Sequence, residues 1–356
     1  MTIAWLHGFQ QPGVPAALAA AVLFGAGTPL AKWLLTAVDP WLLAGLLYLG
    51  AGLGLWLYRW ARKMPAVHLP ATEWPWLIGA IIAGGVVGPV LLMLGLSGMS
   101  ASEASLLLNA EAVFTALLAW FVFRENVDRR IALGMAAIVA GAIVLSCPAG
   151  GWAGVNLDAI GPGFAVLGAC LAWGIDNNLT RRVALADASW IAALKGLIAG
   201  SVNLILALAL GAAWPEPGRI AAALFLGLLA YGASLTLFVV ALRHLGTART
   251  GAYFSTAPFI GAAIAIPFLG ESAPAAFWLA ALLMGGGVWL HLTERHAHEH
   301  AHEPLEHDHV HTHDEHHQHA HDFEWESEEP HHHPHQHAAT THTHRHFPDS
   351  HHRHGH

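Results

Sequence analysis

The segment from Leu96 to Glu125 reads LSGMSASEASLLLNAEAVFTALLAWFVFRE, and the segment from Leu242 to Glu271 reads LRHLGTARTGAYFSTAPFIGAAIAIPFLGE. The two segments align without a gap, and each contains an apolar stretch that closes on a glutamate. Each stretch is long enough to cross the hydrocarbon core of a bilayer, which is roughly 30 Å thick. The pair therefore indicates a membrane protein built from two related halves.

Ten apolar runs succeed one another along the chain, separated by short connections that carry Pro, Gly or charge. A helix needs about 20 such residues to span a bilayer. The runs lie at residues 15–36, 40–58, 75–97, 102–123, 130–147, 159–180, 189–211, 219–242, 248–269 and 275–292. Because these runs leave no polar outer face, they argue against a large soluble helical protein. We predict an all-α membrane protein with ten transmembrane helices.

The repeat continues outside the two opening segments. Gly25–Lys32 in the first half matches Gly174–Arg181 in the second, and Gly141 lies opposite Gly287. Each half has five spans, so the second half must enter the membrane upside down. Inverted repeats are typical of transporters, whose substrate site lies near the midplane between the halves. The predicted parts are an N-terminal segment (1–14), a first repeat (15–147), an inter-repeat loop (148–158), a second repeat (159–292) and a tail (293–356).

With this repeat the chain resembles the EamA family of the drug/metabolite transporter superfamily over residues 15–292. The resemblance rests on Trp173-Gly174 with Arg181, on the two segments that end at Glu125 and Glu271, and on the glycines of the fifth and tenth spans. It implies secondary transport of a small metabolite through a central cavity between two helix bundles. It does not imply a particular substrate.

The distribution of Lys and Arg predicts the orientation. If the N-terminus is cytoplasmic, the inside loops carry eleven Lys and Arg residues, whereas the outside loops carry only Arg219. Such a bias is the rule for cytoplasmic loops of membrane proteins. We therefore expect a multi-pass protein of the cytoplasmic (inner) membrane with both termini in the cytoplasm.

Ionisable and amide side chains at bilayer depth are costly, so each is a candidate functional group. Glu111, near the middle of the fourth span, is the first choice for contacting the substrate or carrying a proton, although helix packing is an alternative role. Glu103 is expected on the same helical face, eight residues earlier. The further candidates for substrate or coupling-ion contacts are Asn109, Asp176, Asn177, Asn178, Lys195, Asn203, Lys32, Tyr253 and Ser255.

Several of these candidates have an alternative structural interpretation. Asp176, Asn177 and Asn178 form a polar cluster that lines a cavity or caps the helix end beside Arg181. Lys195 pairs with a carboxylate or, as we favour, extends to the membrane interface. Glu125 and Glu271 lie at span ends and are expected to close turns or pair with bases. The tryptophans are mostly expected at the membrane interface.

The tail holds 24 of the 28 histidines, interleaved with Asp, Glu and small residues. Its net charge is about −10, against about +2 for the rest of the chain. Neutral imidazole binds Zn²⁺, Ni²⁺, Cu²⁺ and Co²⁺. The predicted metal ligands are His296, His298, His300, His302, His307, His309, His311, His313, His316, His317, His319, His321, His331, His332, His333, His335 and His337. We expect this tail to be disordered without metal; an incidental or pH-sensitive polar tail is the alternative.

These observations favour a secondary transporter of a small metabolite or drug-like solute, with a metal-binding tail. Two alternatives stay open: a divalent transition-metal transporter that uses the tail as collector or sensor, and a membrane protein that stores or senses metal without transport. Because no nucleotide-binding or hydrolase motif is present, we expect neither an enzyme nor a pump. The expected partners are the lipid bilayer, a small-molecule substrate and transition metal ions, but no nucleic acid; a homodimer is left open. No cofactor is required.

Overall fold

A computed structural model describes residues 13–122, 129–146, 157–184 and 186–292, together with four strands between residues 297 and 345. The chain divides into a helical unit and a smaller unit from Arg295 to Phe347, and each is considered by itself. In the first half, the helices are α2 (Gly13–Leu34), α3 (Pro40–Ala61), α4 (Trp74–Ala80), η1 (Ile81–Val87), α5 (Gly88–Gly98), α6 (Ala101–Leu107), α7 (Ala110–Phe121) and α8 (Arg129–Ser146). In the second half, they are α9 (Leu157–Val183), α10 (Ala188–Ala209), α11 (Pro217–Gly227), η2 (Leu228–Ala233), α12 (Ser234–Phe254), α13 (Ala257–Leu269) and α14 (Ala275–Leu292).

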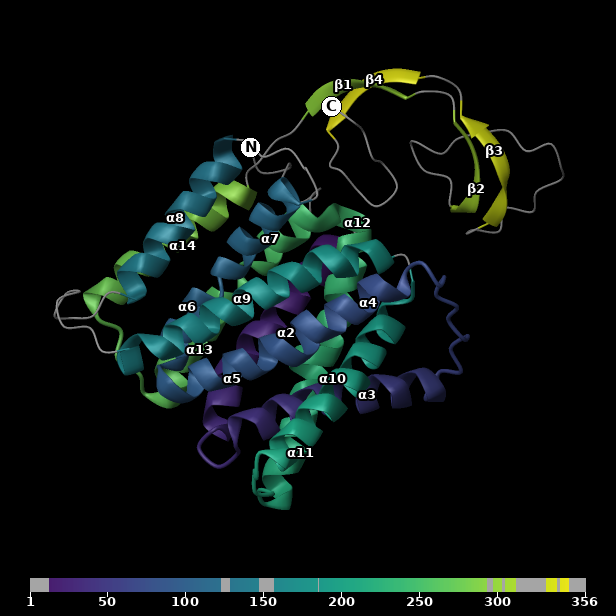
Figure 1. Ribbon diagram of the computed structural model, residues 1–356. Helices are drawn as coiled ribbons and strands as arrows, with labels where there is room; N and C mark the ends of the chain where they lie inside the picture. The colour runs from purple at the N-terminus through teal and green to yellow at the C-terminus, as the bar shows by residue number, and fades with distance from the viewer. Residues whose placement is uncertain are drawn as a thin grey trace. The chain divides into compact units, whose positions relative to one another are not determined.

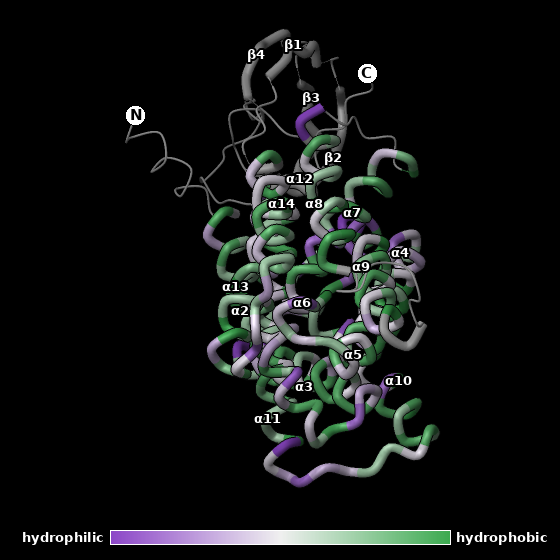
Figure 2. The backbone as a smooth tube through the Cα atoms, turned by 90° about the vertical axis from the view of Figure 1, so that its left-hand side faces the viewer, coloured by the Kyte–Doolittle hydropathy of each residue, from purple (hydrophilic) through white to green (hydrophobic). Residues whose placement is uncertain are grey.

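The helical unit has the length and hydropathy of a multi-pass membrane protein, and apolar residues run along most of its helices (Figure 2). Seven helical segments of the described chain are long and apolar enough to span a bilayer: Gly13–Leu34, Pro40–Ala61, Trp74–Gly98, Ala101–Phe121, Ala188–Ala209, Pro217–Leu245 and Thr250–Leu269. Two shorter apolar helices cover Ala132–Leu145 and Ala275–Leu290. The number of ten spans therefore stays a prediction.

Short polar sequences position the helix ends. Asp39 precedes α3, and its carboxylate accepts hydrogen bonds from the backbone N–H groups of Trp41 and Leu42. Ser100 is the N-cap of α6: its hydroxyl oxygen accepts a hydrogen bond from the Glu103 N–H, and the hydroxyl donates one to the Glu103 carboxylate. Gly270 ends α13 in the left-handed conformation, with φ of 65°, which glycine adopts without strain.

Helix packing follows the internal repeat (Figure 1). In the first half α2 packs against α12 and α13, and in the second half the corresponding helix α9 packs against α5 and α7. Two further pairs join corresponding helices, α3 with α10 and α8 with α14. Glycines allow the α3–α10 approach, since a Cβ atom on Gly196 would lie 2.4 Å from the Gly52 nitrogen.

The irregular parts of the helices also occur at similar positions in the two halves. The π-helical segments η1 and η2 end at Val87 and Ala233, which have the same spacing in sequence as Leu96 and Leu242. A two-residue turn with right-handed helical backbone angles separates α6 from α7, and a similar turn, shifted by one residue in the repeat, separates α12 from α13. π-Helical turns and broken helices are common at functional sites of proteins and in transporters.

One of these turns lies inside a predicted span. The run 102–123 corresponds to the candidate span Ala101–Phe121, in which a tight turn at Leu108 and Asn109 separates α6 from α7. The shared face of Glu103 and Glu111 stays a prediction. The Asn109 side chain donates a hydrogen bond to the Leu106 carbonyl at 2.9 Å. Such local bonds compete with helix continuation, which explains the break.

The expected disorder of the tail without metal stays a prediction, and four short segments of the tail are described as paired strands. β1 (Ala297–His302) pairs antiparallel with β4 (Thr340–Arg345), and β2 (Leu305–His311) with β3 (His331–His337). In this register His298 is opposite His344, and His309 is opposite His333. Pairing satisfies the backbone groups that a solvated tail would leave to water. The predicted ligands His296, His313, His316, His317, His319 and His321 lie outside the described residues.

An ion pair fixes the connection before α10. The Asp187 carboxylate, which caps α10, accepts hydrogen bonds from the Trp190 N–H, the Ser189 hydroxyl and the Arg59 guanidinium. Arg59 also donates to the Pro65 carbonyl at 2.9 Å. Partial burial opposes ionisation of Asp187, but the hydrogen bonds and the charge of Arg59 hold its pKa below the usual range of aspartate.

We expect Asp187→Asn to lower the melting temperature of the purified protein at pH 7. Because the folded-state pKa is depressed, the carboxylate stabilises the fold above the unfolded-state pKa of about 3.9 and loses this effect as pH falls through the lower folded-state pKa. Melting curves of wild type and variant in detergent at pH 7, 4 and 2.5 test this, with Asp39→Asn as a control that removes the charge of an N-cap residue outside the described ion pairs. A melting difference of constant size at all three pH values would contradict the prediction.

Candidate functional site

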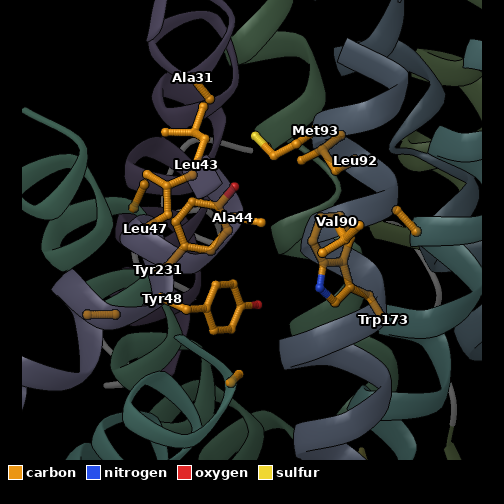
Figure 3. Close-up of a cluster of buried hydrophobic side chains, with 14 of the residues drawn as sticks. Ala31, Leu43, Ala44, Leu47, Tyr48, Val90, Leu92, Met93, Trp173 and Tyr231 are labelled. Carbon is orange, nitrogen blue, oxygen red and sulfur yellow. The ribbon is translucent and has the colours of Figure 1, made fainter. Parts of the chain in front are cut away.

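A cavity opens between helices of both halves, with an empty volume of about 470 Å³ including its mouth. Figure 3 shows three of its aromatic residues, with Tyr48 and Tyr231 on one side and Trp173 on the other. The first half contributes α2, α3 and α7, and the second half contributes α9, η2 and α12. The lining residues are Phe24, Tyr48, Glu111, Trp173, Asp176, Asn177, Ala230, Tyr231, Ser234, Leu235, Phe238 and Phe254.

A second cavity of about 350 Å³ adjoins the first. It extends toward the break between α12 and α13, where Ser255 and Pro258 line it. The two cavities share the residues Phe24, Glu111, Asn177, Phe238 and Phe254. Glu111 therefore lies where the two spaces meet.

Glu111 lies in the first turn of α7, directly after the helix break. Its carboxylate accepts a hydrogen bond from Asn177 Nδ2 at 2.8 Å, and the same amide nitrogen is 3.3 Å from Thr115 Oγ1. The described partner of the Glu111 carboxylate is thus the neutral amide of Asn177, at the point where the two cavities meet.

Asp176, next to Asn177 on α9, forms a buried ion pair with Lys195 of α10. Thr180 donates to the same carboxylate oxygen at 2.7 Å. The Lys195 side chain is only 1% exposed, so the favoured expectation that it reaches the membrane interface is wrong. The reason is that Asp176, on the neighbouring helix, offers the ammonium group a charged partner inside the protein.

Backbone carbonyls of the π-helical segment η1 accept hydrogen bonds from side chains, two of which line the cavity. The Gly84 carbonyl accepts hydrogen bonds from the Tyr48 hydroxyl at 2.7 Å and from Trp173 Nε1 at 2.9 Å, and the Gly85 carbonyl accepts one from Asn203 Nδ2 at 3.1 Å. Figure 3 shows the Tyr48 hydroxyl and the Trp173 indole pointing toward one another. A side chain on Gly84 would collide with Asp176, so this close approach requires glycine.

The remaining candidates lie outside the cavity lining. Asn109 and Asn178 bond backbone carbonyls, and each leaves a buried side-chain oxygen without a partner among the described residues. Lys32 donates to the carbonyls of Leu96 and Met99. The Glu103 carboxylate accepts a hydrogen bond from the N-cap Ser100, and Asn203 donates one to the Gly85 carbonyl of η1. Tyr253 packs against a small buried cluster of Val14, Ala16, Ala17, Ala241 and Leu245. Of the predicted residues, the cavities bring together Glu111, Asp176, Asn177 and Ser255.

Of the two glutamates at span ends, Glu271 and Glu125, only Glu271 lies among the described residues. Glu271 caps α6, because its carboxylate oxygens accept hydrogen bonds from the backbone N–H groups of Ala101 and Ser102 at 2.7 and 2.8 Å. This contact joins the two halves and fits the expected turn-closing role. Glu125 lies outside the described residues.

The cavity residues Phe24, Tyr48, Phe238 and Phe254 were missed by sequence reasoning. Phe24 is central: its ring centroid lies 5.7 Å from Trp173, 5.8 Å from Tyr231 and 5.3 Å from Phe254. The expectation that tryptophans are mostly interfacial does not hold for Trp173, which is buried. A usable signal was its place in the interior of α9, three residues before Asp176.

These features define a helical membrane transporter whose two halves enclose a polar and aromatic cavity. The chain belongs to the EamA-like transporter family, whose model matches residues 11–147 and 162–293. It is 26% identical over 287 residues to an uncharacterized transporter of Methanothermobacter thermautotrophicus, covering 77% of this chain and 84% of that protein.

Two further comparisons cover different shares of the chain. Over 85 residues, 24% of this chain, it is 35% identical to 74% of a probable 4-amino-4-deoxy-L-arabinose-phosphoundecaprenol flippase subunit, ArnE, of Pseudomonas fluorescens. A crystal structure of another protein matches with a TM-score of 0.63 at 19% identity, covering 78% of this chain and 95% of that one. At this identity the match shows a shared fold alone.

Proposed function

We propose that this membrane transporter of small solutes is a secondary transporter of the cytoplasmic membrane, without enzymatic activity, and that it moves a metabolite or drug-like solute through the cavity. The observation that carries the proposal is Glu111, a carboxylate at the junction of two cavities enclosed by both halves. We further propose that ten spans form two inverted repeats, because corresponding helices pack in corresponding pairs.

The cavity favours an organic solute over a divalent metal ion. Within the described residues, no three His, Cys, Asp or Glu side chains lie close enough together to hold a metal. The cavity lining consists mainly of aromatic and apolar side chains, which suit an organic body. Transition metals prefer imidazole, thiolate or several carboxylate ligands.

Cellular solute content tests the transport proposal. Metabolites and transition metals are measured in cells with the gene, without it, and with a gene truncated after Arg295. A metabolite whose level changes with the gene and also with the truncated gene supports transport of an organic solute. Changes confined to Zn, Ni, Co or Cu, and lost on truncation, would instead favour the metal alternative.

The proposed orientation makes a labelling prediction. Cysteines introduced singly at Arg62, Arg130 and Arg243 should resist a membrane-impermeant thiol reagent in intact cells, whereas a cysteine at Glu216 should react. The physical reason is the excess of basic residues in the loops assigned to the cytoplasm. Permeabilised cells provide the control for accessibility. Labelling of Arg62→Cys from outside would reverse the proposed orientation.

We also propose that the tail binds transition metals. The full-length protein should bind several Ni²⁺ or Zn²⁺ ions at pH 7.5, and the protein truncated after Arg295 should bind markedly fewer. Because protons compete for the imidazole nitrogens, binding should weaken steeply as pH falls through about 6.5. Isothermal titration of both purified proteins at pH 7.5 and pH 5 measures the difference. Equal stoichiometry for the two proteins would refute metal binding by the tail.

A further inference from the structure

The walls of the cavity are unusually rich in aromatic rings. Tyr48, Trp173, Tyr231, Phe238 and Phe254 line it together with Phe24. Ring contacts connect them into one cluster, since Phe24 touches Trp173, Tyr231 and Phe254, Tyr231 lies 5.2 Å from Tyr48, and Phe254 lies 4.9 Å from Phe238. Aromatic faces are negative, so they attract an organic cation as well as an apolar body.

The charged groups of the cavity leave one negative charge uncompensated. Asp176 is neutralised by Lys195, which is buried behind it and also bonds Thr180 at 3.2 Å. Glu111 is different, because its hydrogen-bond partner in the described structure is the neutral amide of Asn177. Neither of the ion pairs found among the described residues includes Glu111. When Glu111 is ionised, the cavity therefore carries a net charge of −1.

From these two observations we infer that the substrate is an organic monocation: an ammonium group on an apolar or aromatic body. The ammonium group would bind beside the Glu111 carboxylate, and the body would lie against the rings around Phe24. This inference rests on the proposed transport through the cavity, because it names the solute class for the same site.

Other solute classes fit the cavity less well. An anion would meet the Glu111 charge, and the described lining of the cavity contains no Lys, Arg or His. Lys195, buried nearby, is held by Asp176. A zwitterionic amino acid that binds through its ammonium group would also bring its own carboxylate close to the Glu111 carboxylate, which repels it. A neutral solute would gain the apolar contacts but no attraction from an ionised Glu111. A bare divalent metal would lack ligands among the described residues.

Four probes with the same phenylethyl framework separate these classes: phenethylammonium (cation), phenylalanine (zwitterion), 3-phenylpropionate (anion) and 2-phenylethanol (neutral). Binding to the purified full-length protein is measured at pH 7 by calorimetry. We expect phenethylammonium to bind at least tenfold more tightly than each of the other three. Equal or tighter binding of any of them would overturn the inference, and this comparison needs no variant.

Substitutions of cavity residues test whether phenethylammonium binds in the cavity. Glu111→Gln keeps the size of the side chain and its acceptor for Asn177 but removes the charge, so phenethylammonium affinity should fall at least tenfold. Phe24→Leu keeps an apolar side chain but removes the central ring, and should weaken binding roughly 5- to 30-fold. The controls are Glu216→Gln, outside the cavity, and Phe121→Leu, whose ring is 70% exposed. Unchanged affinity in Glu111→Gln, with a wild-type melting curve, would place the cation elsewhere and refute the assignment.

Uptake into proteoliposomes separates two outcomes: failure of the cation site and failure of transport through the cavity. Glu111-dependent binding of phenethylammonium without any flux would refute transport and leave the cation site standing. Glu111-dependent flux of phenylalanine or phenylpropionate, without binding of the cation, would refute the cation class and leave transport standing. Glu111-dependent binding together with flux of phenethylammonium supports both.

Discussion

Glu111→Gln is expected to reduce transport roughly ten- to a hundredfold while the protein still inserts and accumulates in the membrane. The carboxylate lies at the junction of both cavities, and its described hydrogen-bond partner is neutral. Hydrogen bonds to charged groups contribute about 1.5–3 kcal/mol, and every 1.4 kcal/mol corresponds to about a tenfold change. The expected loss corresponds to removal of one charged hydrogen bond between Glu111 and the solute. If Glu111 instead carries a proton during transport, Gln cannot replace it, because an amide does not take up that proton.

The measurement is solute flux normalised to the amount of protein in the membrane. Gln retains the oxygen that accepts the Asn177 hydrogen bond, so the contact between α7 and α9 should survive. Glu216→Gln removes a carboxylate from the N-cap of α11, outside both cavities, and should leave flux unchanged. Wild-type flux in Glu111→Gln would remove this carboxylate from the mechanism.

The overall architecture was accessible from the sequence because two long segments repeat without a gap. Apolar runs and repeated spacing report the length of helices and their order, and these determine which helices correspond. The π-helical segments and the turns within the spans could not be predicted from the sequence in the same way. The π-helical segment η1 arises where Gly84 must come close to Asp176, a long-range contact that no local pattern encodes. The break before α7 depends on a single side-chain bond from Asn109.

The candidate site was predicted in part for the same reason. Polar residues inside apolar runs are conspicuous, so Glu111, Asp176 and Asn177 could be selected before their neighbours were known. The sequence did not reveal which of these residues face each other, because that depends on how α7, α9 and α10 pack. Lys195 shows this limit: its burial depends on Asp176, 19 residues away in sequence. Aromatic rings are frequent in apolar spans, so the residues around Phe24 gave no distinct signal.

The buried ion pair between Lys195 and Asp176 leads to the second large effect that we expect. Lys195→Met should lower stability by about 3–5 kcal/mol, because it leaves the Asp176 carboxylate buried without its cation. Asp176→Asn should have a comparable effect, since it leaves the ammonium group of Lys195 unpaired. The double variant should be less damaging than the sum of the two, because it removes both charges together.

Melting curves of the four purified proteins in detergent measure this cycle. Lys63→Met, which removes a lysine charge from an exposed turn, should change the melting temperature little. Thr180 bonds both members of the pair and remains in every variant, so the non-additive part reports the interaction between the two charges. If the two single effects simply add, Lys195 and Asp176 stabilise the fold independently. Strong coupling would mean that Asp176 is neutralised from within the protein, and only then does Glu111 carry the charge of the cavity alone.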